Sequence, residues 1–413
     1  MFKAVSSILQ GSRYSINFIM IIFYVFYFIP IGLDIVFGIP VYTYETSFIL
    51  ASHDTKTSLI YNIFIAMVPV IWSYTAISRV NRVGIALKNK QPISMIIYII
   101  GLLSPILLLL FSPSPFMYEQ YGRAVQGFPT LEAGAYHAFI SGATFLSAIS
   151  YFLLLIENKR RECIFVILFG TPFLFISIWL NGKRGIVALI LVLLIYALWK
   201  RNVLRPINLL LVTIVFTGML LSFSSLYQQT FRYNMLQINN WEEVYQNLRV
   251  DMGRDDVTKM AIYAQVSPEK LEILDHPFQS YLFTVIMFVP RELWSGKPWP
   301  YAVYATSALL QIPNQYVGWS MTTGILDETI ANVGWLGFLL GPLIISCVVR
   351  IGDRNQTTVI QLFTILVGSL MLVLQIAAFA PIFLLWILLV GWQMLRRNRQ
   401  ALPNDEKDRF AKI

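Results

Sequence analysis

The chain has 413 residues, of which 57% are hydrophobic and 13% are charged, and its formal net charge is +9. Soluble domains carry about 25% charged residues, so this composition excludes a soluble globular protein. Apolar segments of about 18 to 22 residues, long enough to cross a bilayer, recur along nearly the whole sequence. The positive charge is better explained by membrane topology than by nucleic acid, and no nucleic-acid partner is expected.

The sequence predicts an all-α, polytopic membrane helix bundle. About ten spans are expected, at residues 17–38, 59–77, 93–112, 134–156, 163–180, 185–199, 207–226, 333–351, 357–375 and 378–395. With the amino terminus placed in the cytoplasm, 20 of the 31 Lys and Arg residues lie inside and 11 outside. This excess follows the positive-inside rule and places both termini in the cytoplasm. The first apolar run is expected to be an uncleaved span rather than a signal peptide.

Four parts follow from this pattern. They are a first membrane bundle of about seven spans (1–226), a large extracytoplasmic loop (227–332), the last three spans (333–395) and a basic cytoplasmic tail (396–413). Within the loop, apolar spacing predicts short helices at Asn240–Arg249 and Asp251–Val266, and a further helical turn from Ser267. Tyr281–Val289 is apolar but too short to span, which suits a re-entrant or interfacial helix. The prolines after it are expected to break regular structure.

Lys183 and Arg184 occupy the tip of a hairpin between two apolar segments. At about 1.5 Å per residue, Cys163–Leu180 and Gly185–Trp199 extend roughly 27 Å and 22 Å, against a hydrocarbon core of about 30 Å. The tip of so short a hairpin is expected at the depth of the outer lipid headgroups. Two cations there suit a lipid-linked phosphate, although snorkelling interfacial charges would give the same pattern.

Cysteine and histidine usage argues against metal and disulfide sites. Cys163 and Cys347 both lie inside apolar runs, without the spacing of a metal site. The three histidines are His53, His137 and His276. The adjacent carboxylates Asp255 and Asp256 suit a cation or, equally, the first turn of a helix. No metal is expected.

The predicted loop contains a Pro-Arg-x-x-Trp-x-x-Lys-Pro element, from Pro290 to Pro298. It is preceded by the segment Arg249–Val257 and followed by Gly318–Gly324, Asp327-Glu328 and Asn332–Gly337. Together with the hairpin tip Gly182-Lys183-Arg184-Gly185, this combination resembles the oligosaccharide repeat-unit polymerases of bacterial surface polysaccharides, the Wzy family. The resemblance covers the whole topology, whereas the specific motifs cover a small part of the chain.

The resemblance implies a GT-C-like helix bundle in the bacterial inner membrane and a glycosyltransferase that acts on its outer face. The enzyme would transfer the growing glycan from undecaprenyl diphosphate to the sugar of an incoming lipid-linked unit, without a cofactor. Its implied partners are undecaprenyl-diphosphate-linked oligosaccharides, the lipid bilayer, and a chain-length regulator and a flippase of the same pathway.

Three other functions stay open at this point. An O-antigen-ligase-like transferase shares the same leaving group, so charge patterns do not exclude it. A non-enzymatic flippase or transporter would favour charges throughout the bundle interior, whereas here they concentrate in the loop and the hairpin tip. A membrane acyltransferase would ordinarily show an intramembrane or loop histidine, for which His137 in the fourth expected span is the only candidate.

A diphosphate leaving group needs cations that stabilise its developing negative charge. The expected diphosphate-binding residues are Lys183, Arg184, Arg254, Arg291 and Lys297, and Arg184 and Arg291 are expected to act in catalysis. Three of these residues also have structural roles as alternatives to phosphate binding. Arg254 could pair with Asp251 or Asp255, Arg291 could hold Glu292 or a loop carbonyl, and Lys297 could snorkel.

The acceptor hydroxyl needs a base, and the candidates are Asp255, Asp256, His276, Asp327 and Glu328. The sequence alone does not choose among them, although Glu328 has the better position, just above the eighth expected span. Asp34 is an acid inside the first span, and it is expected to face a wet cavity or a Tyr or Ser partner.

Aromatic residues are frequent in the large loop expected at 227–332. Trp294, Trp299, Tyr301 and Trp319 are expected to bind sugar, because sugar faces are apolar and pack on rings, and Tyr304 and Tyr316 accompany them. An interfacial aromatic belt would account for at least part of this set.

Overall fold

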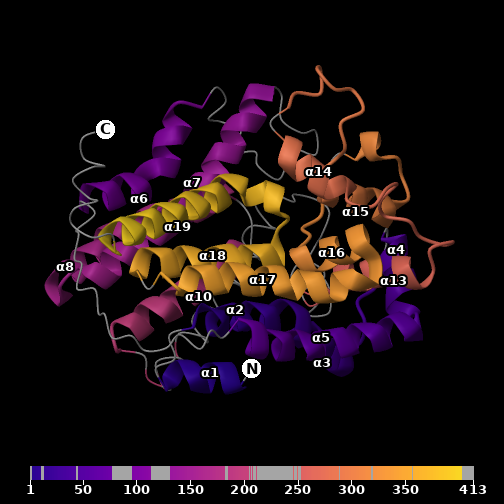
Figure 1. Cartoon of the computed structure of the whole chain (residues 1–413), viewed down its shortest axis with the longest axis horizontal. Helices are drawn as coiled ribbons and strands as arrows, with labels where there is room; N and C mark the ends of the chain where they lie inside the picture. Colours follow the sequence, from indigo (N-terminus) through magenta and orange to yellow (C-terminus); the bar gives the residue numbers. More distant parts are fainter. Residues whose placement is uncertain are drawn as a thin grey trace.

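The computed structural model describes residues 2–10, 14–42, 45–76, 95–112, 131–181, 185–203, 253–287, 289–317, 320–355 and 357–401, and the single residues 205, 207, 211, 245 and 249. Throughout these residues the regular elements are helices, and no β-strand occurs among them. The predicted all-α class is therefore confirmed for the described part of the chain (Figure 1).

The first half of the chain contributes α1 (Phe2–Leu9), α2 (Ser15–Phe23), η1 (Tyr24–Phe28), α3 (Ile29–Phe37), α4 (Thr46–His53), α5 (Thr55–Thr75), α6 (Met95–Leu110), α7 (Leu131–Glu157), α8 (Arg160–Phe165), η3 (Val166–Gly170), α9 (Thr171–Asn181) and α10 (Gly185–Lys200). The second half contributes α13 (Asp255–Val266), α14 (Gln279–Ile286), α15 (Tyr301–Leu310), η4 (Asn314–Tyr316), α16 (Ile325–Val333), η5 (Gly334–Leu336), α17 (Gly337–Asp353), α18 (Thr358–Val373), η6 (Ile376–Phe379) and α19 (Ala380–Ala401). Pro300 and Pro313 lie on either side of α15, a helix that the proline pattern did not predict.

Within the described residues, six helical segments are long and apolar enough to cross a membrane. They are Ser15–Phe37, Thr55–Thr75, Phe139–Glu157, Arg161–Leu180, Ile325–Asp353 and Ile376–Arg396. Three other expected spans coincide with shorter apolar helices, at Met95–Leu110, Ile186–Lys200 and Thr358–Val373. Most of the span expected at 207–226 lies outside the described residues. The chain is thus a multi-pass membrane protein, and the number ten stays a prediction.

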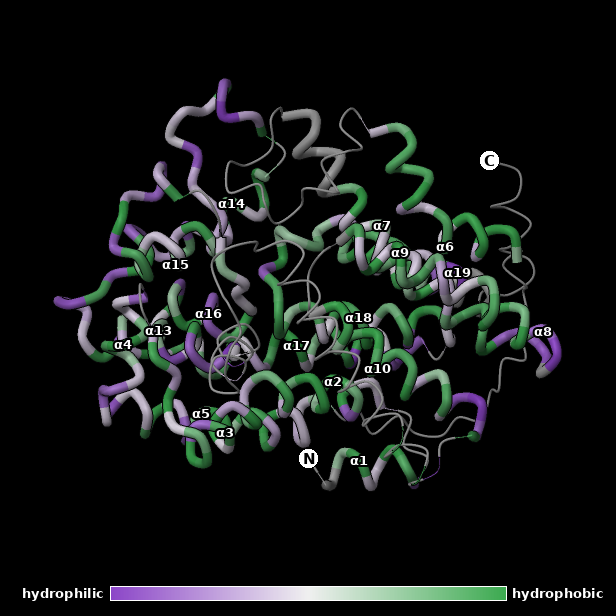
Figure 2. Tube along the Cα trace, turned by 180° about the vertical axis from the view of Figure 1, so that it is seen from behind, coloured by the Kyte–Doolittle hydropathy of each residue, from purple (hydrophilic) through white to green (hydrophobic). Residues whose placement is uncertain are grey.

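The helices lie in a bundle with two polar ends. α2, α10, α17, α18 and α19 run side by side across the centre of Figure 1, and α6, α7 and α9 pack against each other beside them. α4, α13, α14, α15 and α16 gather at one end, here called the loop end. The opposite end, where α10 ends and α8 begins, is called the basic end. Figure 2 shows hydrophilic stretches at both ends and mostly apolar helices between them.

The two ends are held by different polar contacts. At the basic end Asp353, the last residue of α17, accepts hydrogen bonds from the backbone and the hydroxyl of Ser15, at 3.1 Å and 2.5 Å. Arg201, just after α10, donates to the carbonyl of Leu155 near the end of α7. Because Ser15 begins the span that ends at Phe37, Asp34 lies at the other end of that span, the loop end.

The first span changes its hydrogen-bond pattern half-way, in the π-helical turn η1. Such turns free backbone carbonyls for other partners. Here the Phe26 carbonyl accepts the Arg254 backbone N–H at 3.1 Å, and the Tyr27 carbonyl accepts the Tyr61 hydroxyl at 2.7 Å. Phe26 precedes the end of the span at Phe37 by about 16 Å of helix. The start of α13, expected in an outer loop, therefore lies about half-way along the first span.

α16 and α17 fold back on each other at a turn around Gly334, which has a φ of 62°. The Thr329 hydroxyl donates to the Gly337 carbonyl at 3.1 Å, and a Cβ on Gly341 would lie 2.6 Å from that hydroxyl oxygen. In a straight helix these residues would be about 12 Å and 18 Å away from Thr329. α16 is therefore a short helix that returns into the bundle, within residues expected to form the outer loop. The small Gly337 and Gly341 permit this close approach.

Candidate functional site

Five charged side chains from the first span and from the segment around α13 form one buried cluster at the loop end, here called the Arg249 cluster. Its members are Asp34, Arg249, Asp255, Asp256 and Lys259. Arg249 Nε lies 2.7 Å from Asp34 Oδ1, and Arg249 Nη2 lies 2.6 Å from Asp255 Oδ2. Arg249 Nη1 reaches Asp256 Oδ2 at 3.2 Å, and Lys259 Nζ reaches Asp255 at 2.9 Å and Asp34 at 3.7 Å. The Arg249 side chain is 1% exposed, so water contributes little to screening these charges.

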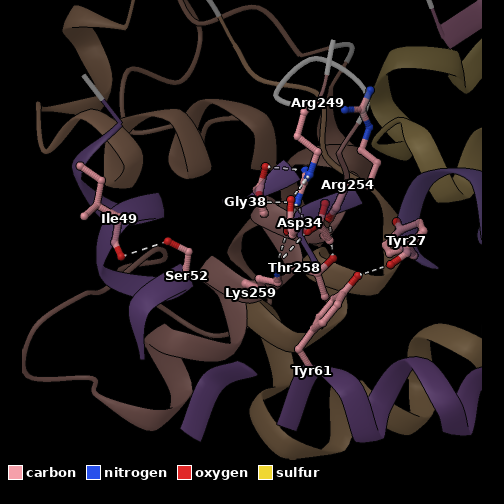
Figure 3. Close-up of polar contacts among 12 residues, drawn as sticks. Tyr27, Asp34, Gly38, Ile49, Ser52, Tyr61, Arg249, Arg254, Thr258 and Lys259 are labelled. Atoms are coloured by element: carbon pink, nitrogen blue, oxygen red, sulfur yellow. Dashed lines mark hydrogen bonds and ion pairs between the residues drawn. The ribbon is translucent and has the colours of Figure 1, made fainter. Parts of the chain in front are cut away.

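Local sequence explains how this cluster forms. Asp255 and Asp256 occupy the first turn of α13, where the helix dipole favours negative charge. Gly253 makes room for Arg249, because a Cβ at position 253 would collide with the Arg249 guanidinium. The ammonium of Lys259 lies 5.3 Å from the centre of the Tyr61 ring on α5. The cluster therefore attaches α13 both to the first span and to α5 (Figure 3).

The Arg249 cluster carries three carboxylates and two cations, one negative charge in excess when all are ionised. Burial, and next the charge of Asp255, raises the pKa of Asp256 to about 7. Burial alone would lower the pKa of Arg249, but the surrounding carboxylates raise it well above its usual value. Arg249 therefore stays charged, and the pKa of Asp256 lies near neutral pH.

Arg254 lies at the start of α13 and packs against the first span. Its backbone N–H bonds to the Phe26 carbonyl, and its guanidinium carbon lies 5.6 Å from the centre of the Phe26 ring. In Figure 3 the Arg249 guanidinium reaches Asp34, whereas that of Arg254 points away from it. Arg254 thus packs against the middle of the first span and is 6% exposed.

α16 carries two buried acids. Asp327 Oδ1 accepts the Gly324 backbone N–H at 2.8 Å, which closes the first turn of the helix. Glu328 Oε1 accepts the Ser280 hydroxyl of α14 at 2.8 Å. Asp327 Oδ2 and Glu328 Oε2 are buried and have no hydrogen-bond partner among the described residues, and neither acid forms an ion pair there. α16 thus presents two carboxylate oxygens whose hydrogen-bonding capacity is unused.

Two tyrosines from neighbouring helices lie near these acids. Burial, and next the charges of Glu328 and Asp327, raises the pKa of Tyr281 on α14. Burial and the same two carboxylates raise the pKa of Tyr301 on α15. Both hydroxyls are buried without a hydrogen-bond partner in the described part of the chain. Helices α14, α15 and α16 therefore enclose a buried polar region of carboxylates and phenols.

The Pro-Arg-x-x-Trp-x-x-Lys-Pro element forms a compact turn, and residues 289–299 are here called the Arg291 loop. Arg291 donates to the carbonyls of Lys297 and Pro298 at 2.7 Å and 2.9 Å, and its guanidinium carbon lies 3.6 Å from the centre of the Trp299 ring. Lys297 donates to the carbonyls of Met287 and Val289 at 2.9 Å and 2.8 Å. The bond of Arg291 to loop carbonyls, one of the two alternatives for this residue, is therefore present. Neither cation has a carboxylate partner among the described residues.

Of the other predicted site residues, some lie outside the described residues, some are exposed and one is buried. Lys183, Arg184 and Trp319 lie outside the described residues, so the convergence of Arg184 with Arg291 stays a prediction. His276 is exposed in the segment before α14, and Trp294 is 41% exposed in the Arg291 loop. Tyr301 is 1% exposed and lies near the α16 acids, away from the surface.

Two features of the site escaped the sequence analysis. Arg249 had no predicted role, although the cost of a charge in a membrane span required a strong partner for Asp34. A wet cavity or a Tyr or Ser partner was expected for Asp34, and the Tyr245 hydroxyl lies 3.5 Å from its carboxylate. Ser280 is a neutral residue that no motif singled out, and Asn332, which begins the quoted segment Asn332–Gly337, had no predicted role.

Among the described residues, no group of three or more His, Cys, Asp or Glu side chains is arranged to hold a metal ion. Comparison of the chain with protein-family models, with curated proteins and with solved structures gave no match. The family resemblance therefore depends on the motif residues and the topology alone.

Proposed function

We propose that this protein is a membrane glycosyltransferase that polymerises lipid-linked oligosaccharide repeat units on the outer face of the bacterial inner membrane. It transfers the growing glycan from undecaprenyl diphosphate to a sugar hydroxyl of the incoming lipid-linked unit. The supporting observation is that α14 joins a candidate base to the candidate phosphate-binding loop. Ser280 on α14 bonds to Glu328, and Phe283 on the same helix has its ring 4.9 Å from the ammonium of Lys297.

The residues have complementary roles in this reaction. The acceptor oxygen attacks the anomeric carbon, the bond from that carbon to the diphosphate oxygen breaks, and Glu328 takes the hydroxyl proton. Arg291 uses two of its five N–H donors on loop carbonyls, and Lys297 uses two of three, so both retain donors for phosphate oxygens. Arg254, Lys183 and Arg184 are further candidate phosphate ligands. Trp294 and Trp299 offer rings to sugar, whereas Asp255 is occupied by Arg249 and Lys259.

The test is polymerisation in proteoliposomes supplied with lipid-linked repeat units from cells that lack the polymerase. Glu328→Gln is expected to lower the rate by about 10²-fold or more, because it removes the base, and single units accumulate. Glu292→Gln, a change at an exposed acid of the Arg291 loop, is the matched control and keeps the wild-type glycan ladder. A normal ladder from Glu328→Gln would exclude Glu328 as the base. No ladder from the wild-type protein would count against the polymerase itself.

A second candidate is a proton-coupled flippase for the same lipid-linked glycans. The observation in its favour is that Asp327 and Glu328, buried acids on the short helix α16 that folds back into the bundle, form no ion pair among the described residues. Such acids mark proton relays in transporters. Translocation of a labelled lipid-linked glycan that follows an imposed pH gradient, without chain growth, would favour this function. A ligase would instead move the glycan from its carrier to a different acceptor.

A further inference from the structure

The hydrogen bonds around Glu328 form a chain in which each donor and each acceptor can be assigned. The Asn332 side-chain nitrogen Nδ2 lies 2.7 Å from the Glu328 backbone oxygen, which can accept and never donate. This contact fixes the orientation of the Asn332 amide. The same nitrogen lies 2.8 Å from Ser280 Oγ, so Asn332 donates a hydrogen to the serine as well.

The serine must then pass a hydrogen onward. Its oxygen accepts from Asn332, and its own hydrogen points to Glu328 Oε1, 2.8 Å away. Oε1 is therefore an acceptor, and a proton placed on it would face the serine hydrogen. Any proton on the Glu328 carboxyl belongs on Oε2, which is buried and has no hydrogen-bond partner in the described part of the chain.

We infer that Ser280 and Asn332 are positioning residues that make Oε2 the atom of Glu328 through which a proton is gained or lost. This inference rests on the proposed role of Glu328 as the base. Asn332 lies on α16 beside Glu328, whereas Ser280 belongs to α14, the helix that leads to the Arg291 loop. Docking of α14 on α16 therefore orients the base at the same time as it places the loop.

Among the described residues, the charged and titratable groups around Glu328 supply no other donor to Oε1. Asp327 is adjacent on α16, Tyr281 and Tyr301 come from α14 and α15, and Arg254 lies at the start of α13. α18 has no charged residue, and the charged residues of α17, Arg350 and Asp353, lie at its far end. The Ser280 hydroxyl is the hydrogen-bond donor that the structure assigns to Oε1.

The direct test is the infrared carbonyl stretch of protonated Glu328, recorded at acidic pH and identified by its loss in Glu328→Gln. In the wild type this carbonyl is Oε1 and accepts a hydrogen bond, so Ser280→Ala is expected to shift the band to higher frequency. Ser280→Thr keeps a hydroxyl and keeps the band in place. Ser280→Cys, nearly isosteric and a weaker donor, gives an intermediate frequency and serves where the alanine variant does not fold.

Kinetics provide the second readout. Ser280→Ala is expected to lower kcat about ten- to a hundredfold with KM little changed, and Ser280→Thr to restore it, because a hydrogen bond to a charged group is lost and regained. An unshifted band in Ser280→Ala, or a normal kcat, would overturn the inference. If the wild type polymerises no lipid-linked unit, the proposed function fails, and the infrared shift still decides the assignment of Oε2.

Discussion

The Arg249 cluster and the Arg291 loop use similar residues in opposite ways. Each joins an arginine, a lysine and an aromatic ring, but Arg249 bonds to carboxylates, whereas Arg291 bonds to backbone carbonyls. Arg249 and its partner Asp34 are 215 residues apart in sequence, whereas Arg291 and Pro298 are 7 apart. The first arrangement attaches a distant segment to the membrane bundle, and the second shapes its own loop.

The two regions differ in whether their arginine and lysine side chains are already neutralised by carboxylates. In the Arg249 cluster both cations, Arg249 and Lys259, are already paired with carboxylates, so the cluster has little attraction left for an anionic ligand. In the Arg291 loop neither Arg291 nor Lys297 is neutralised by a carboxylate among the described residues. This contrast is why we propose the loop, and not the cluster, for the diphosphate, whereas the cluster holds α13 in place.

The largest effect is expected from breaking the cluster with Arg249→Met. Removing one partner of a buried ion network leaves uncompensated charges, which costs about 3–5 kcal/mol. Thermal unfolding of the detergent-solubilised protein would record this loss. Arg249→Lys keeps the charge without the planar fork and is expected to lie between the two. A melting temperature close to wild type for Arg249→Met would show that the cluster does not attach α13 to the bundle.

A smaller and local effect is expected from Lys297→Met. The change leaves the Met287 and Val289 carbonyls without their donor, at a cost of about 1–3 kcal/mol. Limited proteolysis should then cut within the Arg291 loop while the rest of the bundle stays resistant. A matched change on the exposed side of the loop, Glu292→Gln, should leave the cleavage rate as it is. General loss of resistance would contradict the local role given to Lys297.

The contrast between local contacts and contacts over long sequence distances also explains how much of the fold could be predicted. Apolar length and 3.6-residue periodicity predicted the candidate spans and the helices α13 and α14, because these are local signals. The reversal between α16 and α17 was not predicted. The chain continues apolar through Gly334, and the contacts that fold α16 back, between Thr329 and Gly341, are tertiary.

In the candidate site, too, contacts within a short segment could be predicted, whereas contacts between distant segments could not. Arg291, Lys297 and Pro298 lie within one motif, and a carbonyl partner for Arg291 was among the alternatives. Arg249 and Asp34 are joined only by the fold, and nothing in the spacing of 215 residues indicates a contact. Ser280 and Asn332 act through hydrogen-bond direction, which depends on the placement of single atoms rather than on residue type.

Arg291→Lys tests whether the loop needs a fork or only a charge. A lysine cannot donate to two carbonyls in the arginine geometry while lying flat on Trp299, so a stability loss of about 1 kcal/mol is expected. Polymer length in the proteoliposome assay should shorten with Arg291→Lys and fall to single units with Arg291→Ala. Equal activity of the lysine variant and the wild type would mean that charge alone matters at this position.

The last prediction separates the two regions by pH, through Asp256→Asn. Burial raises the pKa of Asp256 to about 7 in the folded protein, against about 4 in the unfolded chain. The folded state therefore binds more protons between these values, and the contribution of Asp256 to stability falls as pH rises from about 4 to about 7. Asparagine removes this dependence, so the melting temperature of Asp256→Asn relative to wild type should rise across that window and level off above it. Lys297→Met should keep a constant offset over the same window, because the lysine stays charged there. A constant offset for Asp256→Asn as well would mean that the pKa of Asp256 is the same in the folded and unfolded states, so that burial does not raise it in the cluster.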